Sequence, residues 1–176
     1  MYALADRQPL AGDSRRAQGF APIARENARI LILGSLPGQR SIAAQQYYAH
    51  PQNAFWKIMA ELLGAGGCYE QRCATLMESR IALWDVLANS LRPGSGDANI
   101  QIATAVANDF DTFLTLLPAL DRILFNGKKA AEVFERKVLP GLVQCDIRRL
   151  VLPSTSPAYA LMNYAEKLAR WRAALS

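Results

Sequence analysis

The most constraining feature of this sequence is an uninterrupted apolar run, Ile30 to Leu33, that stops at Gly34. Such a run is typical of a strand buried on both faces, which occurs where helices cover both sides of a parallel sheet. The loop that follows contains Pro37 and Gly38, and a helical pattern begins shortly afterwards. Strand, loop and helix in this order predict that the loop lies at the carboxyl edge of an open α/β sheet, where such folds place their ligands.

Further apolar segments of strand type alternate with helical patterns along the rest of the chain. Strands are expected at 29–34, 81–84, 122–125 and 148–152, helices at 51–63, 69–80, 100–117 (in two pieces, broken near residue 108), 128–138 and 161–175, and a loop at 89–99. This alternation predicts an α/β fold, a three-layer sandwich with a central, mostly parallel four-stranded sheet flanked by helices.

Length and composition favour one globular unit. A chain of 176 residues can bury a sizeable core, and its apolar fraction of 51% with 20% charged residues is typical of a folded domain. The first residues are polar, and their apolar residues do not repeat at the spacing of a helix or a strand. We therefore expect a flexible N-terminal extension over 1–19 and a single domain over 20–176.

Several classes of protein are disfavoured. Charged residues interrupt every apolar run and the start of the chain has no secretion signal, so we expect a cytoplasmic protein without a membrane span. The three cysteines, Cys68, Cys73 and Cys145, form no CxxC pair and are too few for a four-cysteine cluster, so no metal or cofactor is expected. The net charge of +5 permits a polyanionic partner.

The loop from Gly34 through Ser35 and Leu36 matches neither a nucleotide-binding glycine loop nor the nucleophile elbow of a hydrolase. The segment that follows it is more informative. Tyr47 and Tyr48 offer flat aromatic surfaces, and Asn53 is expected in the first turn of a helix, where free N–H groups can bind an anion or position a water. An ordinary half-buried aromatic and a capping residue are the alternatives.

His50 is the only histidine, and a lone histidine before a helix is more typical of a structural hydrogen-bonding role than of a catalytic one. Two other loops contain groups suited to phosphate. Lys128 begins a helix after a strand, and Ser154, Thr155 and Ser156 lie in a loop that precedes the last helix. A solvated basic turn and plain helix capping explain these residues equally well.

Together these segments resemble the uracil-DNA glycosylase superfamily from about Phe20 onward. Residues 34–38 (GSLPG) resemble its first motif, residues 48–56 (YAHPQNAFW) resemble the AHPxNxFW segment of the mismatch-specific uracil and thymine glycosylases, and residues 152–154 (LPS) resemble its second motif. Two positions differ, because the mismatch-specific enzymes have asparagines where this chain has Leu36 and Leu152.

The hypoxanthine-DNA (DNA-deoxyinosine) glycosylases share these two differences. This branch resembles the chain in GSLPG, in YYAHPQNxFW, in ALWDV at 82–86 and in the RxGSxDxxI loop at 92–100. The resemblance implies a monofunctional glycosylase in base excision repair that flips a deaminated base out of DNA and hydrolyses its glycosidic bond, with hypoxanthine from deoxyinosine as the expected base.

The resemblance also implies roles for particular residues. Asn53 is expected to be catalytic, a second group to form the base pocket and a third to contact DNA: Gly34, Ser35, Leu36, Tyr48 and His50 for the pocket, and Ser154, Thr155, Ser156 and Lys128 for DNA. The expected partner is double- or single-stranded DNA with a deaminated base, bound by a monomer without a metal or cofactor. The alternatives are a uracil or mismatch-specific glycosylase, a non-catalytic lesion-binding protein of the same fold, and an unrelated enzyme that acts on free nucleosides.

Overall fold

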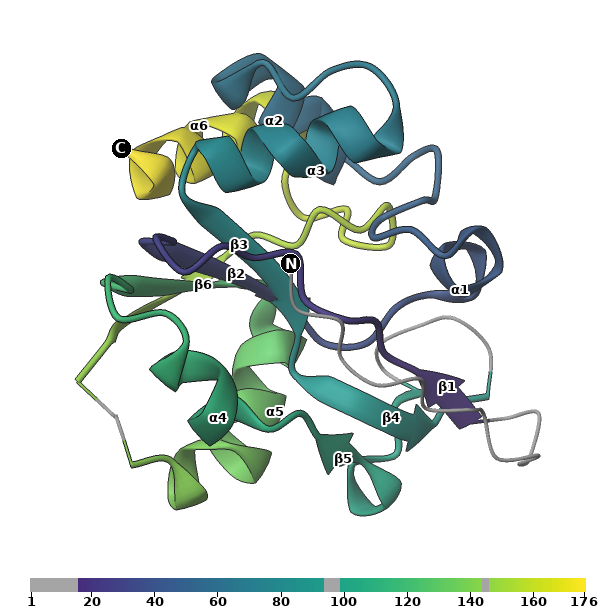
Figure 1. Ribbon diagram of the computed structural model, residues 1–176. Helices are drawn as coiled ribbons and strands as arrows, with labels where there is room; N and C mark the ends of the chain where they lie inside the picture. The colour runs from purple at the N-terminus through teal and green to yellow at the C-terminus, as the bar shows by residue number, and fades with distance from the viewer. Residues whose placement is uncertain (1–15, 94–98, 144–145) are drawn as a thin grey trace.

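The structure, a computed structural model, describes residues 16–93, 99–143 and 146–176 (Figure 1). Its strands are β1 (Arg16–Gln18), β2 (Ile30–Gly34), β3 (Ile81–Asp85), β4 (Leu87–Leu91), β5 (Val106–Ala107), β6 (Arg122–Asn126) and β7 (Arg148–Leu152). Its α-helices are α1 (Gln39–Ala44), α2 (Phe55–Leu63), α3 (Tyr69–Glu78), α4 (Phe110–Thr115), α5 (Lys128–Lys137) and α6 (Tyr164–Leu175), and two short 3₁₀ helices are η2 (Ile102–Thr104) and η3 (Leu139–Gly141).

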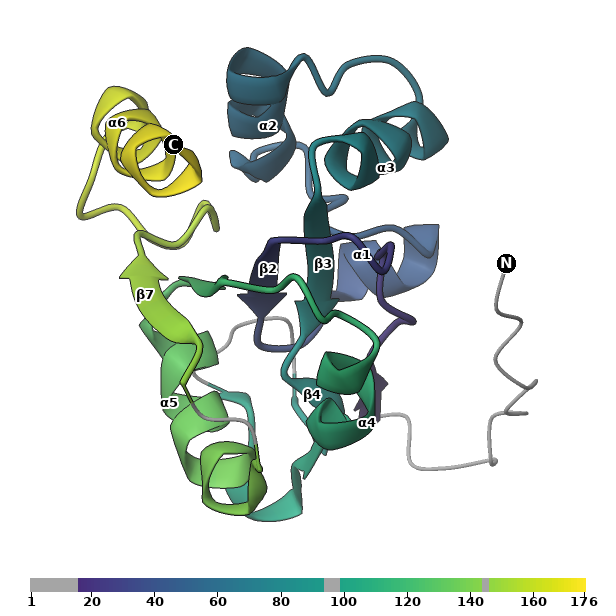
Figure 2. The same ribbon diagram turned by 60° about the vertical axis from the view of Figure 1, so that its left-hand side comes forward.

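The central sheet has the strand order β3-β2-β6-β7, and all of its neighbouring pairs are parallel. Helices α2, α3 and α6 lie on one side of this sheet and α4 and α5 on the other, as the two views agree (Figures 1 and 2). The predicted three-layer α/β sandwich with a four-stranded sheet is therefore confirmed. Parallel strands reach their carboxyl ends at one edge, so the loops that leave β2, β3, β6 and β7 all start there.

The core fills the space on both sides of this sheet. Every residue of β2 and of β3 is buried, as expected for strands with helices on both faces. On the α2/α6 side, the ring centroid of Trp171 lies 6.0 Å from that of Phe55, and on the α5 side Phe134 lies 5.2 Å from Phe125. Burial of this apolar area is the main stabilising term of the fold, and it fixes the sheet edge that carries the loops.

A second, three-stranded sheet, β1-β4-β5, was not anticipated from the sequence. The expected loop at 89–99 is wrong at its start, where β4 pairs with both neighbours, and residues 94–98 of it lie outside the described part. The first piece of the expected helix at 100–117 is wrong, because η2 and β5 occupy it, whereas the second piece forms α4. Pairing with β4 overrides local helix preference there, and α4 starts only after Asp109, whose carboxylate accepts from Thr112 N–H at 3.1 Å.

Two helices begin later than the sequence indicates. Helix α2 starts at Phe55 rather than at residue 51, because residues 47–54 form an irregular turn. Helix α6 starts at Tyr164 because Asn163 and Glu166 form a capping box ahead of it. Helices α3 and α5 begin where they were expected. None of the helices in the described ranges has the length and apolar character needed to span a bilayer.

Candidate active site

The loop after β2 is fixed by main-chain hydrogen bonds that continue past the end of the strand. Val86 N–H donates to Gly34 O at 2.9 Å, and Leu87 N–H donates to Ser35 O at 3.1 Å. Gly34, Ser35 and Leu36 are all buried, so the three pocket residues expected in this loop lie inside the edge of the sheet rather than on its surface. The loop is therefore a rigid element beneath the site.

A buried arginine holds the same loop from the other side. Arg92 is 3% exposed, and its guanidinium donates to Leu36 O at 3.3 Å and also to Pro37 O. A guanidinium has five N–H donors in a planar fork, which suits contact with two neighbouring carbonyls. In the sequence, Arg92 was noted only as the first residue of a segment that resembles related proteins. Its contact with the first loop could not be predicted, because Arg92 and Pro37 are 55 residues apart in the chain.

The turn that follows α1 is pinned at several points. Tyr47 N–H donates to the Tyr69 hydroxyl at 3.0 Å, Tyr47 O accepts from Trp56 Nε1 at 2.7 Å, and Ala49 N–H donates to Ser41 Oγ at 3.2 Å. These contacts hold Tyr48 at φ +55°, a left-handed conformation that aromatic residues rarely adopt. A residue held in such a conformation by its surroundings is characteristic of a functional site.

Asn53 lies two residues before α2, not within its first turn. Its Oδ1 accepts from Phe55 N–H at 3.0 Å, and its own N–H donates to His50 O at 2.8 Å. Because the oxygen faces a backbone donor, the Nδ2 group is the part of the amide that can donate to a ligand. His50 has the structural contact expected for a lone histidine, since its Nδ1 accepts from Gln52 N–H at 3.2 Å.

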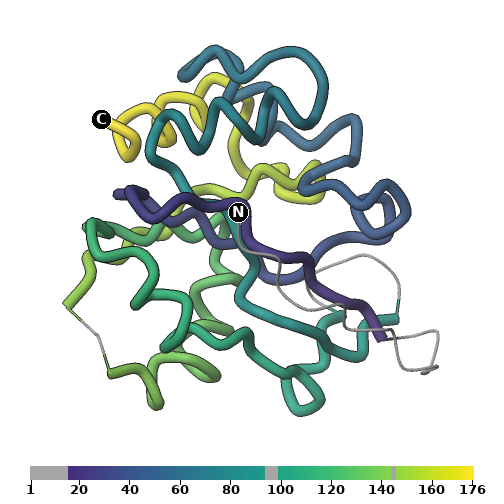
Figure 3. The backbone as a smooth tube through the Cα atoms, in the orientation of Figure 1, coloured from purple at the N-terminus to yellow at the C-terminus, as the bar shows by residue number. Residues whose placement is uncertain are grey.

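A buried amide clamp joins this turn to the loop after β7. Asn126 Nδ2 donates to Thr155 Oγ1 at 2.8 Å, and Thr155 N–H donates back to Asn126 Oδ1 at 2.8 Å. Thr155 O in turn accepts from Ala54 N–H at 2.9 Å, so the chain segments around residues 54 and 155 run side by side (Figure 3). Thr155, expected at the DNA surface, is 1% exposed and connects β6 to the Asn53 turn.

The β6 turn depends on a glycine. Gly127 has φ +99°, and a Cβ built on it would lie 2.9 Å from Ser154 Cβ, closer than side-chain carbons approach. Ser154 is half-buried against this glycine, Ser156 is half-buried, and Lys128 is exposed at the start of α5. Ser156 N–H donates to Ser154 Oγ at 3.2 Å, which keeps the loop tightly turned.

A second buried cation holds the loop after β7. Lys167 is 6% exposed, and its ammonium donates to Tyr159 O at 2.8 Å and to Ser156 O at 3.5 Å. Burial lowers the pKa of this ammonium below its usual value. Trp171, one turn further along α6, donates from Nε1 to Pro153 O at 3.1 Å. Helix α6 therefore sets the shape of this loop.

Replacing Lys167 by methionine tests this support. The variant keeps most of the side-chain volume but removes the donor to Tyr159 O and leaves Ser156 O with the Tyr159 N–H alone, so the free energy of unfolding should fall by about 1–3 kcal/mol. The melting temperature should drop by about 2–10 °C. Arg170→Met, on an exposed position of the same helix, is the matched control. Equal melting temperatures for the two variants would show that Lys167 does not anchor the loop.

A depression of about 350 Å³ opens beside the Tyr47–Asn53 turn. Tyr48, His50 and Asn53 line it, and Lys57 and Arg72 add positive charge to its wall. One face of the Tyr48 ring is covered by Phe55, with ring centroids 4.2 Å apart. The structure thus brings three of the expected site residues together on one concave surface, of a size suited to a nucleobase.

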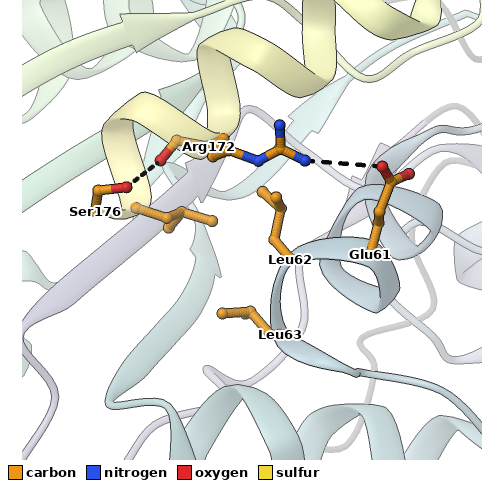
Figure 4. Close-up of a pocket in the computed structure, with 6 residues that line it drawn as sticks. Glu61, Leu62, Leu63, Arg172 and Ser176 are labelled. Carbon is orange, nitrogen blue, oxygen red and sulfur yellow. Dashed lines mark hydrogen bonds and ion pairs between the residues drawn. The ribbon is translucent and has the colours of Figure 1, made fainter.

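A second depression, of about 230 Å³, lies between α2 and α6 and contains none of the expected site residues. Glu61 and Arg172 form an ion pair across it at 3.8 Å, and Ser176 Oγ donates to Arg172 O at 2.9 Å (Figure 4). Its other lining side chains are leucines of the two helices, Leu62, Leu63 and Leu175. This surface offers structural contacts between helix ends rather than a reacting group.

Two positions lack the polar side chains of related motifs. Leu36 is 5% exposed and Leu152 is 8% exposed, and both belong to the hydrophobic core. A leucine can neither orient a water nor bond a base, so any chemistry at this edge comes from other residues. Within the described ranges, no group of three or more His, Cys, Asp or Glu side chains is placed to bind a metal ion.

Comparison with known proteins gives consistent matches. The family model for the uracil DNA glycosylase superfamily matches residues 21–175. A protein from Methanosarcina acetivorans named hypoxanthine DNA glycosylase is 41% identical over 134 residues, covering 70% of this chain and 84% of the relative. A Methanosarcina barkeri protein of the same name is 41% identical over 120 residues, covering 66% of this chain and 75% of the relative.

A solved structure matches as well. It is a solution NMR structure of a Methanosarcina acetivorans protein assigned to the uracil DNA glycosylases. The two chains superpose with a TM-score of 0.76 at 37% sequence identity, and the alignment covers 91% of this chain and 96% of the other. Similarity therefore extends over the sheet, the helical layers and the loops at the carboxyl edge.

Proposed function

The chain belongs to the uracil-DNA glycosylase superfamily, and on that basis we propose that it is a hypoxanthine-DNA glycosylase, which removes hypoxanthine from deoxyinosine in DNA. The observation that carries the proposal is the depression on which Tyr48, His50 and Asn53 meet. Two relatives named for this activity also support the proposal, because this chain aligns with 84% and 75% of their lengths. Release of the damaged base starts base excision repair.

Binding begins with removal of the base from the duplex. A base inside the stack cannot be reached, so the enzyme flips the nucleotide into a pocket, and a poorly paired deoxyinosine costs less to flip than a normal nucleotide. In this proposal the flipped base stacks on the face of the Tyr48 ring that Phe55 does not cover. Stacking of a base on an aromatic side chain contributes about 1–3 kcal/mol.

Asn53 acts at the glycosidic bond. Its amide does not titrate, so it works through positioning and electrostatics rather than as a general base. With Oδ1 accepting from Phe55 N–H, its Nδ2 donates to the departing purine as negative charge develops there. The N-terminus of α2 lies beside it and favours the same negative charge.

Contacts with the DNA backbone come from the surrounding loops. We assign these contacts to Ser154, Ser156 and Lys128, because hydroxyl and ammonium donors suit phosphate oxygens. Lys128 is exposed and the two serines are half-buried. Thr155 contributes indirectly, by holding the loop through Asn126. The enzyme acts as a monomer, because one protein molecule suffices for one flipped base. Its substrate is double- or single-stranded DNA in the cytoplasm.

The direct test is a cleavage assay on labelled duplexes and single strands that contain one deoxyinosine, deoxyuridine or deoxyxanthosine, with alkali to break abasic sites. Cleavage at deoxyinosine supports the proposal. Cleavage only at deoxyuridine would move the chain to the uracil-specific members. Tight binding to the lesion without any cleavage would indicate a lesion sensor instead.

Substitution of Tyr48 tests the stacking role. Tyr48→Leu removes the flat ring and should weaken binding of a deoxyinosine duplex by about 5- to 100-fold, since stacking contributes on the order of 1–3 kcal/mol. Tyr48→Phe keeps the ring and should bind nearly as the wild type does. Fluorescence anisotropy with labelled duplex measures both dissociation constants. Equal loss in both variants would assign the effect to the hydroxyl group rather than to stacking.

A further inference from the structure

Two cationic side chains on the wall of the depression have no role in the proposal above. Lys57 belongs to α2 and Arg72 to α3, and they line the same depression as Tyr48 and Asn53. Among the described residues that line it there is no Asp or Glu, so the wall carries a net positive charge. A concave surface of one charge concentrates ligands of the opposite charge, here anions.

Lys57 is held in place by an aromatic ring. Its Nζ lies 4.0 Å from the centroid of the Tyr164 ring. Glu61 follows one turn later on α2, at the spacing of a helical ion pair. Its two carboxylate oxygens are instead 2.9 Å from the Tyr164 hydroxyl and 3.8 Å from Arg172 Nη2. The ring fixes the ammonium without neutralising it, so Lys57 keeps a charge that can meet an anion.

Arg72 is fixed by the main chain that precedes its own helix. It is half-buried, and its Nε donates to Gly67 O at 2.9 Å. The other N–H groups of a guanidinium lie on its two terminal nitrogens and form a fork that matches two oxygens of a phosphate. In the part of the chain that the structure describes, neither Arg72 nor Lys57 forms an ion pair with a carboxylate. Two fixed cations of this kind are suited to an anionic ligand.

Small residues accompany these cations. Ala60, Ala65 and Gly66 also line the depression, and the last two lie in the short connection between α2 and α3. Their small size lets the backbone of a ligand approach the protein closely. The depression therefore has two parts. The turn at 46–53 supplies an aromatic ring and an amide, and the wall formed by α2 and α3 supplies charge and room.

A nucleotide flipped into this depression brings its backbone with it. It is joined to a phosphate on each side of its sugar, and every nucleotide of the strand adds one negative charge. Lys128, assigned above to phosphate contact, begins α5 in one helical layer, whereas α2 and α3 lie in the other (Figures 1 and 2). We propose that Lys57 and Arg72 bind phosphates of the lesion strand next to the flipped nucleotide, so that the strand crosses the wall formed by α2 and α3. This inference rests on the proposed glycosylase function and deepens it by placing the DNA strand.

Contacts with phosphates have a measurable signature. A lysine or arginine that binds a phosphate releases counterions, so the logarithm of the affinity falls linearly with the logarithm of the salt concentration, by about 0.9 per contact on duplex DNA. Phosphates are the same in every sequence, so the contribution is equal for damaged and undamaged DNA. Cations that act on the departing base would instead matter only when that base is in the pocket.

The test removes these charges one at a time. The enzymes are the wild type, Lys57→Gln, Arg72→Gln, the double variant and the control Lys137→Gln, at the exposed last residue of α5, far along the helix from Lys128. Fluorescence anisotropy gives dissociation constants over a range of salt concentrations. The ligands are an undamaged duplex and a duplex with 2′-fluoro-2′-deoxyinosine, whose glycosidic bond resists hydrolysis. Melting temperatures check folding.

Each single variant should bind both duplexes about 2- to 5-fold more weakly, the range expected for an exposed ion pair. The salt dependence should become shallower by about 0.9 in each single variant and by about 1.8 in the double variant. Lys137→Gln should match the wild type. A wild-type salt dependence in the double variant would overturn the inference. A loss confined to the duplex with the damaged base would also overturn it, and would assign both cations to the base.

Neutral methylphosphonates locate the contact. One phosphate of the lesion strand is replaced at a time. At one position beside the damaged nucleotide, the wild type should lose about 2- to 5-fold in affinity while Lys57→Gln loses nothing further. Equal losses in both proteins at every position would overturn the inference. None of these measurements needs base release, so failure of the wild type to release hypoxanthine would reject only the proposed function.

Discussion

Replacement of Asn53 by alanine is expected to slow hypoxanthine release by about 10²- to 10³-fold, the loss typical when one preorganised donor to developing charge is removed. The dissociation constant for a deoxyinosine duplex should change little, because the donor matters most when the glycosidic bond is breaking. Single-turnover kinetics and equilibrium binding separate the two quantities.

Asn53 also has a structural task that has to be separated from the chemical one. Its Oδ1 accepts from Phe55 N–H at 3.0 Å, so alanine also removes a helix-capping contact worth about 1 kcal/mol. Asn53→Asp keeps that acceptor and the favourable interaction of a carboxylate with a helix N-terminus, but it has no N–H to donate.

The two variants therefore give a clear distinction. If Nδ2 donates to the departing base, Asn53→Asp should be as slow as Asn53→Ala while its melting temperature stays near that of the wild type. Recovery of the wild-type rate in Asn53→Asp would show that only the cap matters. A wild-type rate in Asn53→Ala would contradict the catalytic role altogether.

Much of the fold could be predicted because its signals are local. The apolar runs of β2, β3 and β6 are short and nearly continuous, because helices cover both faces of the sheet there, and the helices between them show clear amphipathic periods. Strand β7, for example, has the predicted bounds, Arg148–Leu152. The same alternation places Gly34 and the Ser154 loop at one edge of the sheet.

The small sheet β1-β4-β5 could not be predicted in this way. Its strands are only two to five residues long and gain their hydrogen bonds from partners far along the chain, such as Arg16 opposite Leu91. Periodicity within a segment does not report such pairing. For the same reason the segment around Val106 had an apparent helical pattern but forms a strand.

The sequence pointed to residues that share one depression but gave no sign of the buried contacts behind them. Tyr48, His50 and Asn53 belong to one continuous motif, and they do line one depression. Arg92 contacts Pro37 and Asp85 lies beside Gly34, both across the sheet edge, and these contacts depend on the tertiary fold. In the sequence Asp85 was visible only as the first polar residue after the apolar run at 81–84.

Among the buried polar residues near the site, Asn126 is the one whose loss should cost the most stability. Its amide makes two hydrogen bonds of 2.8 Å with Thr155, at a site where Asn126 is 7% exposed and Thr155 1% exposed. Asn126→Ala leaves a buried N–H and a buried hydroxyl without partners, so the free energy of unfolding should fall by about 2–4 kcal/mol. The corresponding drop in melting temperature is about 5–15 °C.

Activity should fall together with stability, because Thr155 O accepts from Ala54 N–H next to Asn53. Thr155→Val removes the hydroxyl from the same clamp, so a double-mutant cycle measures the coupling between the two side chains. The double variant should lose less stability than the two single losses added together. Strict additivity would show that the side chains act independently. Wild-type activity of Asn126→Ala, measured well below its melting temperature, would show that the Asn53 turn does not depend on the clamp.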